Sequence, residues 1–360
     1  MTDRQAYVAF NLTEKVGFAT VGELVARAGS VVAAWEQYPK KVSRTGGEVD
    51  WEGEFKLARK FGVEIVTPAD ECYPDSLRNA PGAPLALYVK GDAKALSKPM
   101  VAMIGTRRAT ASGRNFANRL AYDLCKAGWG IVSGLALGID GEAHRGALDA
   151  GGITAGVIGS GLDRFYPEEN RELAREMVKK GGAVVSEFPF GRPPDQETFP
   201  IRNHVVAALA RGVVAVEAPF KSGTLITTGI AADLGRTVMA VPGRPSDRMS
   251  SGCLKLIRDG AILVRNVDDV LEAMSELLPR GAGASGRETR DVRQKGAGDP
   301  DTPKYSVEEA LVMTHVDEDG VSIDELVRKT KLPVTKVNAL AMALRIKGFV
   351  KFLPGNRVSL

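Results

Sequence analysis

Polar residues that could bind a ligand are concentrated in glycine-containing loops, each of which follows an apolar run. The first loop is residues 104–113, IGTRRATASG. Here Gly105 permits a sharp turn, Thr106 offers a hydroxyl, and Arg107 offers a planar five-donor group that matches a phosphate. The loop lacks the GxGxxG pattern of a dinucleotide site. We therefore predict a phosphate contact through Arg107; a surface turn with solvated arginines is the alternative.

The second loop, residues 133–148, contains a candidate acid–base pair. Asp140 and His144 stand four residues apart, which places them on one face of a helix. Because no catalytic nucleophile stands beside them, we favour a structural role in which the pair braces the start of the helix. The small residues at the start of the loop leave room for a ligand above a strand end: Ser133, Gly134 and Ala136.

The third loop, residues 158–170, carries an aromatic ring close to two glycines. Gly159 and Gly161 flank a turn, and Tyr166 precedes a helix that Asn170 is expected to cap. A tyrosine at the opening of a phosphate-lined groove could stack on a nucleic-acid base. It could equally be buried against the sheet, and the sequence leaves both alternatives open.

Two further loops add hydrogen-bond donors at expected helix N-termini, where the helix dipole suits an anion. Arg202 and Asn203 begin the helix expected over residues 199–210. The segment 217–228 offers a second set of donors: Lys221, Ser222, Gly223 and Thr224. The five loops together predict a groove that binds phosphates. The chain contains no P-loop motif and no metal-ligand cluster at recognisable spacing.

The apolar runs between these loops predict a parallel sheet covered by helices on both faces. Nine runs read as strands: 63–68, 85–91, 100–105, 130–134, 153–159, 183–187, 213–218, 237–243 and 261–265. Helical stretches such as 114–128 and 170–181 separate them. We predict an extended Rossmann-like, doubly wound α/β domain over residues 66–278, whose ligand lies at the carboxyl ends of the strands.

Smaller modules are expected on either side of this domain. Residues 1–65 have apolar positions at helical spacing and predict a helical module. Residues 279–303 are rich in Gly, Arg and Asp and predict a flexible linker. Residues 304–360 predict three helices, the third over 334–348, and then a hairpin, which is the order of a winged helix.

Composition narrows the class of protein further. A chain with 44% apolar and 26% charged residues can form a packed core, and its net charge of +4 does not by itself indicate a polyanion partner. Its three scattered cysteines argue against a disulfide framework and against structural zinc. The N-terminus has no signal-peptide pattern, and no apolar run approaches the roughly 20 residues that span a bilayer. We expect a cytoplasmic protein without a membrane partner.

Six segments within residues 70–265 form an ordered series: IGTRR, VSGLALGIDGEAHRGAL, GVIGSGLDRFYPEEN, SEFPFGRPPDQETFPIRNH, VEAPFKSGTLITT and AVPGRPSD…SSGCLKLIRDGA. The series closely resembles the DNA-processing protein A (DprA/Smf) family. The ends resemble the sterile-alpha-motif-like (SAM-like) and winged-helix modules of that family. The resemblance implies a non-enzymatic protein without a cofactor that binds single-stranded DNA, protects incoming strands in natural transformation and loads the RecA recombinase. A homodimer is expected.

The sequence departs from the family pattern at three positions. Thr106 replaces a serine and keeps the hydroxyl, Glu168 stands where a lysine is common, and His204 stands where arginine is frequent. The last two changes remove positive charge, for which Arg164 or Lys221 could compensate.

Two other classes of function are weaker interpretations. The first is a nucleotide-binding or nucleotide-hydrolysing enzyme of a related Rossmann-like superfamily, whose members carry a PGGxGTxxE signature. The corresponding turn here, KSGTLITT, lacks the glutamate. The second is a pure interaction scaffold, which does not explain why five glycine loops converge.

Overall fold

The computed structural model describes residues 1–274, except Lys40 and Thr45, and residues 307–359 with gaps within 318–319, 331–348 and 354–356. The chain forms two compact units, Met1–Ser285 and Gly286–Leu360. The predicted linker over 279–303 and much of the helix predicted over 334–348 lie outside the described residues. The predicted boundaries at residues 65, 278 and 303 stay predictions.

One mixed sheet forms the centre of the first unit, in the order β1-β2-β6-β5-β4-β3-β7-β8-β9. Each predicted apolar run supplies one strand. The strands are β1 (Glu64–Val66), β2 (Leu87–Gly91), β3 (Met100–Ile104), β4 (Gly130–Ser133), β5 (Thr154–Val157), β6 (Ala183–Ser186), β7 (Gly212–Ala215), β8 (Thr237–Ala240) and β9 (Ile262–Leu263). Strands β3 to β7 are fully buried, which explains their near-continuous apolar sequence.

Two strand pairs differ from the expectation of an all-parallel sheet. The seven strands from β3 to β9 pair in parallel, whereas β2 is antiparallel to β6 and β1 is antiparallel to β2. Only residues 92–99, which include a 3-10 turn (Ala93–Ser97), connect β2 to β3. Such a link is shorter than the dozen or so residues of a crossover. The end of β2 must therefore lie at the edge where β3 begins, so β2 runs opposite to β3.

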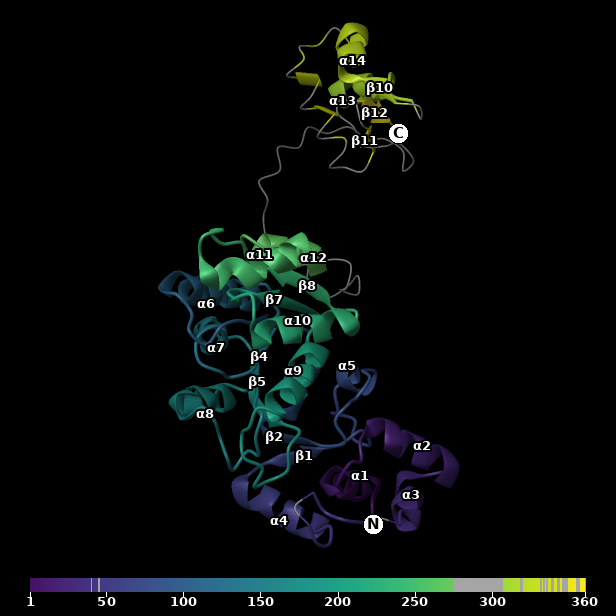
Figure 1. Cartoon of the computed structure of the whole chain (residues 1–360), viewed down its shortest axis with the longest axis vertical. Coiled ribbons are helices and arrows are strands. Elements are labelled where there is room, and N and C mark those ends of the chain that lie inside the picture. Colours follow the sequence, from purple (N-terminus) through teal and green to yellow (C-terminus); the bar gives the residue numbers. More distant parts are fainter. Residues whose placement is uncertain are drawn as a thin grey trace, which may run out of the picture. The chain divides into compact units, whose positions relative to one another are not determined.

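Helices cover both faces of the sheet, as a doubly wound fold requires (Figure 1). One face carries α6 (Ala111–Lys126), α7 (Ile139–Asp149), α8 (Arg171–Lys179) and α12 (Val267–Met274). The other carries α5 (Asp75–Arg78), α9 (Thr198–Leu209), α10 (Gly223–Asp233) and α11 (Ser251–Arg258). Short 3-10 turns precede α8 (Glu168–Asn170) and α11 (Arg248–Ser250). Among the described residues, every helix is too short or too polar to cross a bilayer.

Four helices at the N-terminus pack against the β1–β2 side of the sheet: α1 (Asp3–Leu12), α2 (Phe18–Ala28), α3 (Val31–Gln37) and α4 (Trp51–Phe61). The ring of Phe10 lies at the centre of this module, 5.1 Å from the ring of Trp35 in an edge-to-face arrangement. Val8 on α1 and Ala58 on α4 share an apolar cluster with Ile65 of β1 and Tyr88 of β2. The helical module and the sheet therefore have a common core.

The second unit combines two described helices with a small sheet. The helices are α13 (Val307–Met313) and α14 (Ile323–Thr330), and the strands are β10 (Val321–Ser322), β11 (Lys351–Leu353) and β12 (Arg357–Ser359). The hydroxyl of Ser322 accepts a hydrogen bond from the amide of Glu325 at 3.2 Å and caps α14. The antiparallel β11–β12 pair is the predicted hairpin, and β10 pairs with β12.

We expect Gly146→Ala to destabilise the protein, because α6 and α7 approach so closely that an added Cβ would lie 2.0 Å from the carbonyl oxygen of Asn118. Overpacking of this kind costs about 1–3 kcal/mol. Gly22, inside α2 with nothing near its Cβ position, is the matched control. Gly22→Ala should raise the free energy of unfolding by about 0.5–1 kcal/mol. Urea unfolding measures both changes, and equal effects would contradict the packing argument.

Candidate functional site

A cleft of about 370 Å³ lies at the carboxyl ends of β3 and β7. These strands are neighbours, but the chain continues from β3 toward β4 and from β7 toward β8, so the loops after them separate. The cleft is lined by residues of the loops after β3, β4 and β7 and by α9: Ile104, Gly105, Thr106, Arg107, Arg108, Gly134, Ala136, Asp140, Phe199, Arg202, Asn203, Val206, Ser222, Gly223, Thr224 and Thr227.

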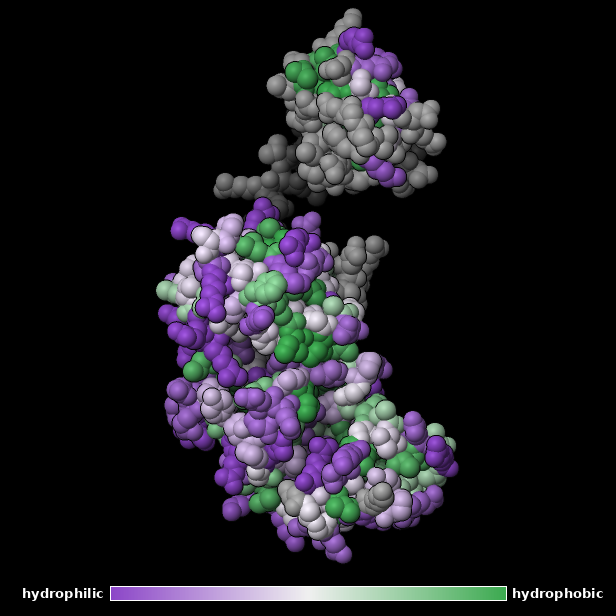
Figure 2. Space-filling model, viewed as in Figure 1, coloured by the Kyte–Doolittle hydropathy of each residue, from purple (hydrophilic) through white to green (hydrophobic). Residues whose placement is uncertain are grey.

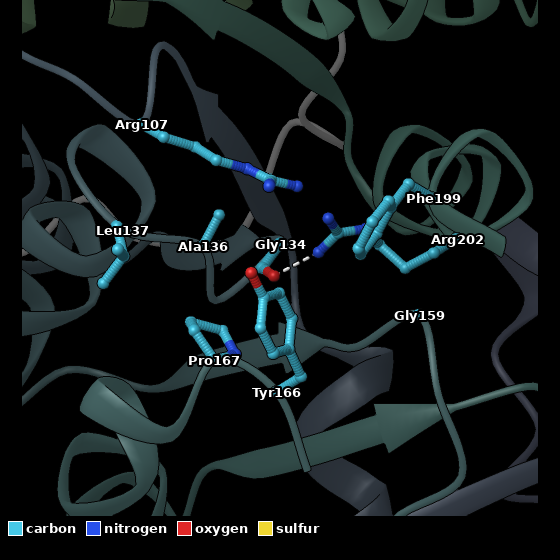
Figure 3. A pocket seen from close by; sticks show the side chains of 9 residues that line it. All are labelled: Arg107, Gly134, Ala136, Leu137, Gly159, Tyr166, Pro167, Phe199 and Arg202. Carbon is cyan, nitrogen blue, oxygen red and sulfur yellow. Dashed lines mark hydrogen bonds between the residues drawn. The ribbon is translucent and has the colours of Figure 1, made fainter. Parts of the chain in front are cut away.

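A small pit of about 20 Å³ adjoins the cleft (Figure 3). Five residues line both spaces: Arg107, Gly134, Ala136, Phe199 and Arg202. The pit is completed by four more: Leu137, Gly159, Tyr166 and Pro167. The loop after β5, which supplies the last three, therefore extends the site beyond the cleft. The structure brings together twelve of the sixteen predicted site residues in these two spaces.

Aromatic rings and an arginine face one another at the pit. Tyr166 is 45% exposed, and its ring lies 6.3 Å from the ring of Phe199, so its position at the opening is confirmed over burial against the sheet. The guanidinium carbon of Arg107 lies 4.9 Å from the Phe199 ring centroid, a cation–π contact. Arg107 is exposed and reaches over the pit (Figure 3). Its charge is therefore available to a ligand.

The N-terminus of α10 supplies another wall of the cleft. Ser222, Gly223 and Thr224 line the cleft there. Ser222 occupies the N-cap position without making a capping bond, and within the described residues its buried hydroxyl has no hydrogen-bond partner. The helix dipole and these donors suit an anion. Lys221 is exposed beside them but does not line the cleft.

The position of Arg202 differs from the prediction that it begins a helix. It lies in the second turn of α9, because Asp195 accepts hydrogen bonds from the amides of Glu197 and Thr198 and the helix starts at Thr198. The side chain is only 6% exposed and donates to the carbonyl oxygens of Gly134 and Val157. Burial lowers its pKa to about 10, although the nearby Asp140 opposes this. Arg202 thus holds the floor of the site together.

Arg202 lines both spaces, whereas four predicted residues lie outside the cleft and the pit. Ser133 is fully buried, and its hydroxyl donates to the carbonyl oxygen of Met103 at 2.5 Å. Asn170 is at the N-cap of α8 but makes no capping bond; its amide instead donates to the carbonyl oxygens of Leu135 and Ala136 at 2.9 and 3.0 Å. The absence of a side chain at Gly161 lets the backbone pass close to Pro189, whose carbonyl oxygen would lie 2.6 Å from an added Cβ. The fourth is Lys221.

Asp140 and His144 do not pair with each other. Asp140 accepts hydrogen bonds from the amides of Gly134 and Ala136 at 3.1 and 3.4 Å. His144 is fully buried, with its Nδ1 2.6 Å from the hydroxyl of Thr154. Burial lowers the pKa of His144 to about 3, with smaller contributions from nearby arginines. These contacts support the structural role, and Asp140 is the only acidic side chain among the residues that line the cleft.

Sequence reasoning missed Phe199, Arg108 and Leu137 as lining residues. Phe199 stands three residues before Arg202 and four before Asn203, the spacing of a single helix face. That spacing could have identified it once α9 was placed. At this helix the prediction considered only the hydrogen-bond donors Arg202 and Asn203 and so passed over the aromatic ring.

Comparison with known proteins identifies the family. Residues 64–275, more than half of the chain, match the family model of DNA recombination-mediator protein A, and residues 297–356 match that of the DprA winged helix domain. The chain is 33% identical to protein Smf of Escherichia coli, over 81% of this chain and 76% of that protein. The chain belongs to the DprA/Smf family. Membership places it among proteins that process DNA in recombination.

Relatives with the name DprA agree in sequence and in fold. The DNA processing protein DprA of Streptococcus pneumoniae is 43% identical over 61% of this chain and 75% of that protein. The X-ray structure of S. pneumoniae DprA superposes with a TM-score of 0.63 at 32% identity, covering 76% of this chain and 98% of that one. A Helicobacter pylori DprA structure, whose subject is a single-stranded DNA binding mode, superposes with a TM-score of 0.53 at 30% identity, over 59% and 96% of the two chains.

We expect His144→Gln to reduce the acid sensitivity of the fold. Because the native pKa of about 3 lies below the ordinary 6.5, the unfolded state binds the proton first as the pH falls. His144 therefore costs stability progressively from about pH 6.5 downward, by about 1.4 kcal/mol per pH unit. Between pH 7 and pH 5, wild type should lose about 2 kcal/mol more than the variant. Urea unfolding at both pH values measures this; identical losses would contradict it.

Proposed function

We propose that this DprA/Smf protein binds single-stranded DNA in the cleft and the adjoining pit. One observation carries the proposal: the exposed Arg107 and the N-terminus of α10 offer charge to phosphates in the same site where Tyr166 and Phe199 offer ring faces. A single strand has both phosphates and unstacked bases, and proteins bind it by combining cationic grooves with aromatic platforms. The single-stranded DNA binding mode of the H. pylori relative supports the same ligand.

The order of the strands gives this site a direction. The loops after β5, β4, β3 and β7 follow one another across the sheet, from Tyr166 to Ser222. Three strand spacings correspond to about 14 Å. Gly134, Ala136 and Gly159 lie along this path and leave room for a backbone to approach closely.

The family resemblance extends the proposal to protection of incoming DNA, loading of RecA in natural transformation, and action as a homodimer. Support for self-association comes from apolar side chains that gather over α10 (Figure 2). Ile226 on α10 is 51% exposed, and Ile262 and Leu263 of the edge strand β9 are 42% and 41% exposed. An exposed apolar edge strand offers unpaired backbone groups and apolar side chains with which another chain can pair.

Titration of labelled oligo-dT and of its duplex across a range of salt concentrations tests the function. Oligo-dT should bind more tightly than blunt duplex, because only a single strand offers base faces to Tyr166 and Phe199. Its affinity should fall steeply with salt, with a logarithmic slope of about −0.7 for each phosphate contact. Equal or tighter binding of the duplex would overturn the proposal for this cleft.

Arg107→Ala should weaken binding of oligo-dT by about ten- to a hundred-fold, because a hydrogen bond to a charged group is worth about 1.5–3 kcal/mol. The salt dependence should fall by about one phosphate contact. The melting temperature should barely change, since Arg107 is exposed.

Arg119→Ala is the matched control. Arg119 lies on α6, is 76% exposed and pairs with Asp123 outside the cleft, so its loss removes the same charge without removing a proposed contact. Both variants are compared in the same oligo-dT titration. Wild-type affinity of Arg107→Ala, or an equal loss in the two variants, would refute the assigned phosphate role.

A further inference from the structure

One buried residue, Glu217, binds both ends of the loop that carries Arg107, one end through its main chain and the other through its carboxylate. Glu217 follows β7 and is only 8% exposed. Its main-chain oxygen accepts a hydrogen bond from the amide of Thr106 at 2.7 Å. Its side-chain Oε2 accepts from the amide of Thr110 at 2.9 Å, and Oε1 accepts from the Thr110 hydroxyl at 2.5 Å. We call residues 105–110 the arginine loop.

The carboxylate of Glu217 occupies the N-terminus of α6, a helix of 16 residues. A Cβ added at Gly113 would lie 2.5 and 2.6 Å from its two oxygens, so the helix needs a glycine there to admit the group. The first helix N-terminus of a Rossmann-like fold is where a nucleotide phosphate normally binds. Here the protein places its own anion at that position.

The hydrogen bonds of the Glu217 carboxylate do not involve the side chains of Arg107 and Arg108. Its oxygens are bound by Thr110, and within the described residues it forms no ion pair with either arginine. On the other side of the arginine loop, the amide of Ile139 donates to the Thr106 carbonyl oxygen at 3.3 Å. The loop is thus fixed between β7 and α7, while both arginines line the cleft.

We propose that Glu217 is an internal anion that takes the place of a nucleotide phosphate at the α6 N-terminus and thereby positions the arginine loop for a DNA strand. Glu217 acts as a positioning residue, since it reaches the strand only through Arg107 and Arg108. The effect on DNA rests on the proposed function. The occupancy of the α6 N-terminus by a carboxylate does not rest on that function, and it can be tested without DNA.

Chemical rescue of Glu217→Ala tests the proposal in the full chain. The variant should bind oligo-dT about tenfold more weakly than wild type, the effect of about one charge-assisted hydrogen bond. Sodium formate should restore the affinity to within a few-fold, because a small carboxylate fits the vacated position. Because salt itself weakens DNA binding, all titrations are made at one fixed ionic strength. Sodium chloride alone should not rescue the variant, and replacing it with formate should leave wild type unchanged. Wild-type affinity of the variant, or a loss that formate leaves in place, would overturn the proposal.

Thermal unfolding separates this inference from the proposed function. Formate or inorganic phosphate should raise the melting temperature of Glu217→Ala, as expected for an anion that binds the native state, and should raise that of wild type less. If wild type fails to bind oligo-dT, the proposed function fails, and this measurement still decides the role of Glu217. Equal anion effects on the two proteins would refute it.

Glu217→Gln covers the case in which the alanine variant does not fold. Glutamine keeps the volume of the side chain but removes the charge, and its amide nitrogen cannot accept a bond from Thr110. It should weaken oligo-dT binding without rescue by formate, because no space is vacated. Wild-type affinity of Glu217→Gln would contradict a role for the charge.

Discussion

The parallel pairing of β3 with β7 creates the cleft, because the chain leaves these two strands in opposite directions. The loops that follow must separate, and among the described residues no connection fills the space between them. Backbone then has to approach backbone closely around that space. An added Cβ at Gly105 would lie 2.4 Å from Ile139, and one at Gly138 would lie 2.4 Å from the carbonyl oxygen of Thr106. The glycine-rich sequence of these loops follows from this geometry.

Charged groups divide into two sets around the cleft according to burial. Asp140, Arg202 and Glu217 are each less than a tenth exposed, and each is hydrogen-bonded to backbone groups of a neighbouring loop. Buried charges are tolerated only with such partners. Their bonds hold separate loops in one arrangement, so that the exposed Arg107 and Arg108 point into a fixed space. The buried set therefore fixes the backbone from which Arg107 and Arg108 project.

The sequence predicted the elements well and the roles of individual side chains less well. Every strand of the nine-stranded sheet could be placed, because each is an apolar run, but the reversed direction of β2 leaves no trace in that pattern. The loops after these strands could be placed as well, because each begins where an apolar run ends. Whether Ser133, Asn170 or Arg202 bonds a ligand or a carbonyl oxygen depends on chain segments about 30 or more residues away. Local spacing cannot supply that information.

Glu168 and the two side chains expected to compensate for it, Arg164 and Lys221, differ in their ion pairs. Glu168 forms a two-pronged ion pair with Arg171 at 2.5 and 2.6 Å, so both side chains are engaged with each other at the surface. Arg164, in the same loop, lies 3.7 Å from Asp163, which offsets its charge. Lys221 is exposed and, within the described residues, has no ion pair. Within the described residues, the cationic groups near the cleft that form no ion pair therefore include Arg107, which lines it, and Lys221, which lies beside it. The loop after β5 contributes the ring of Tyr166.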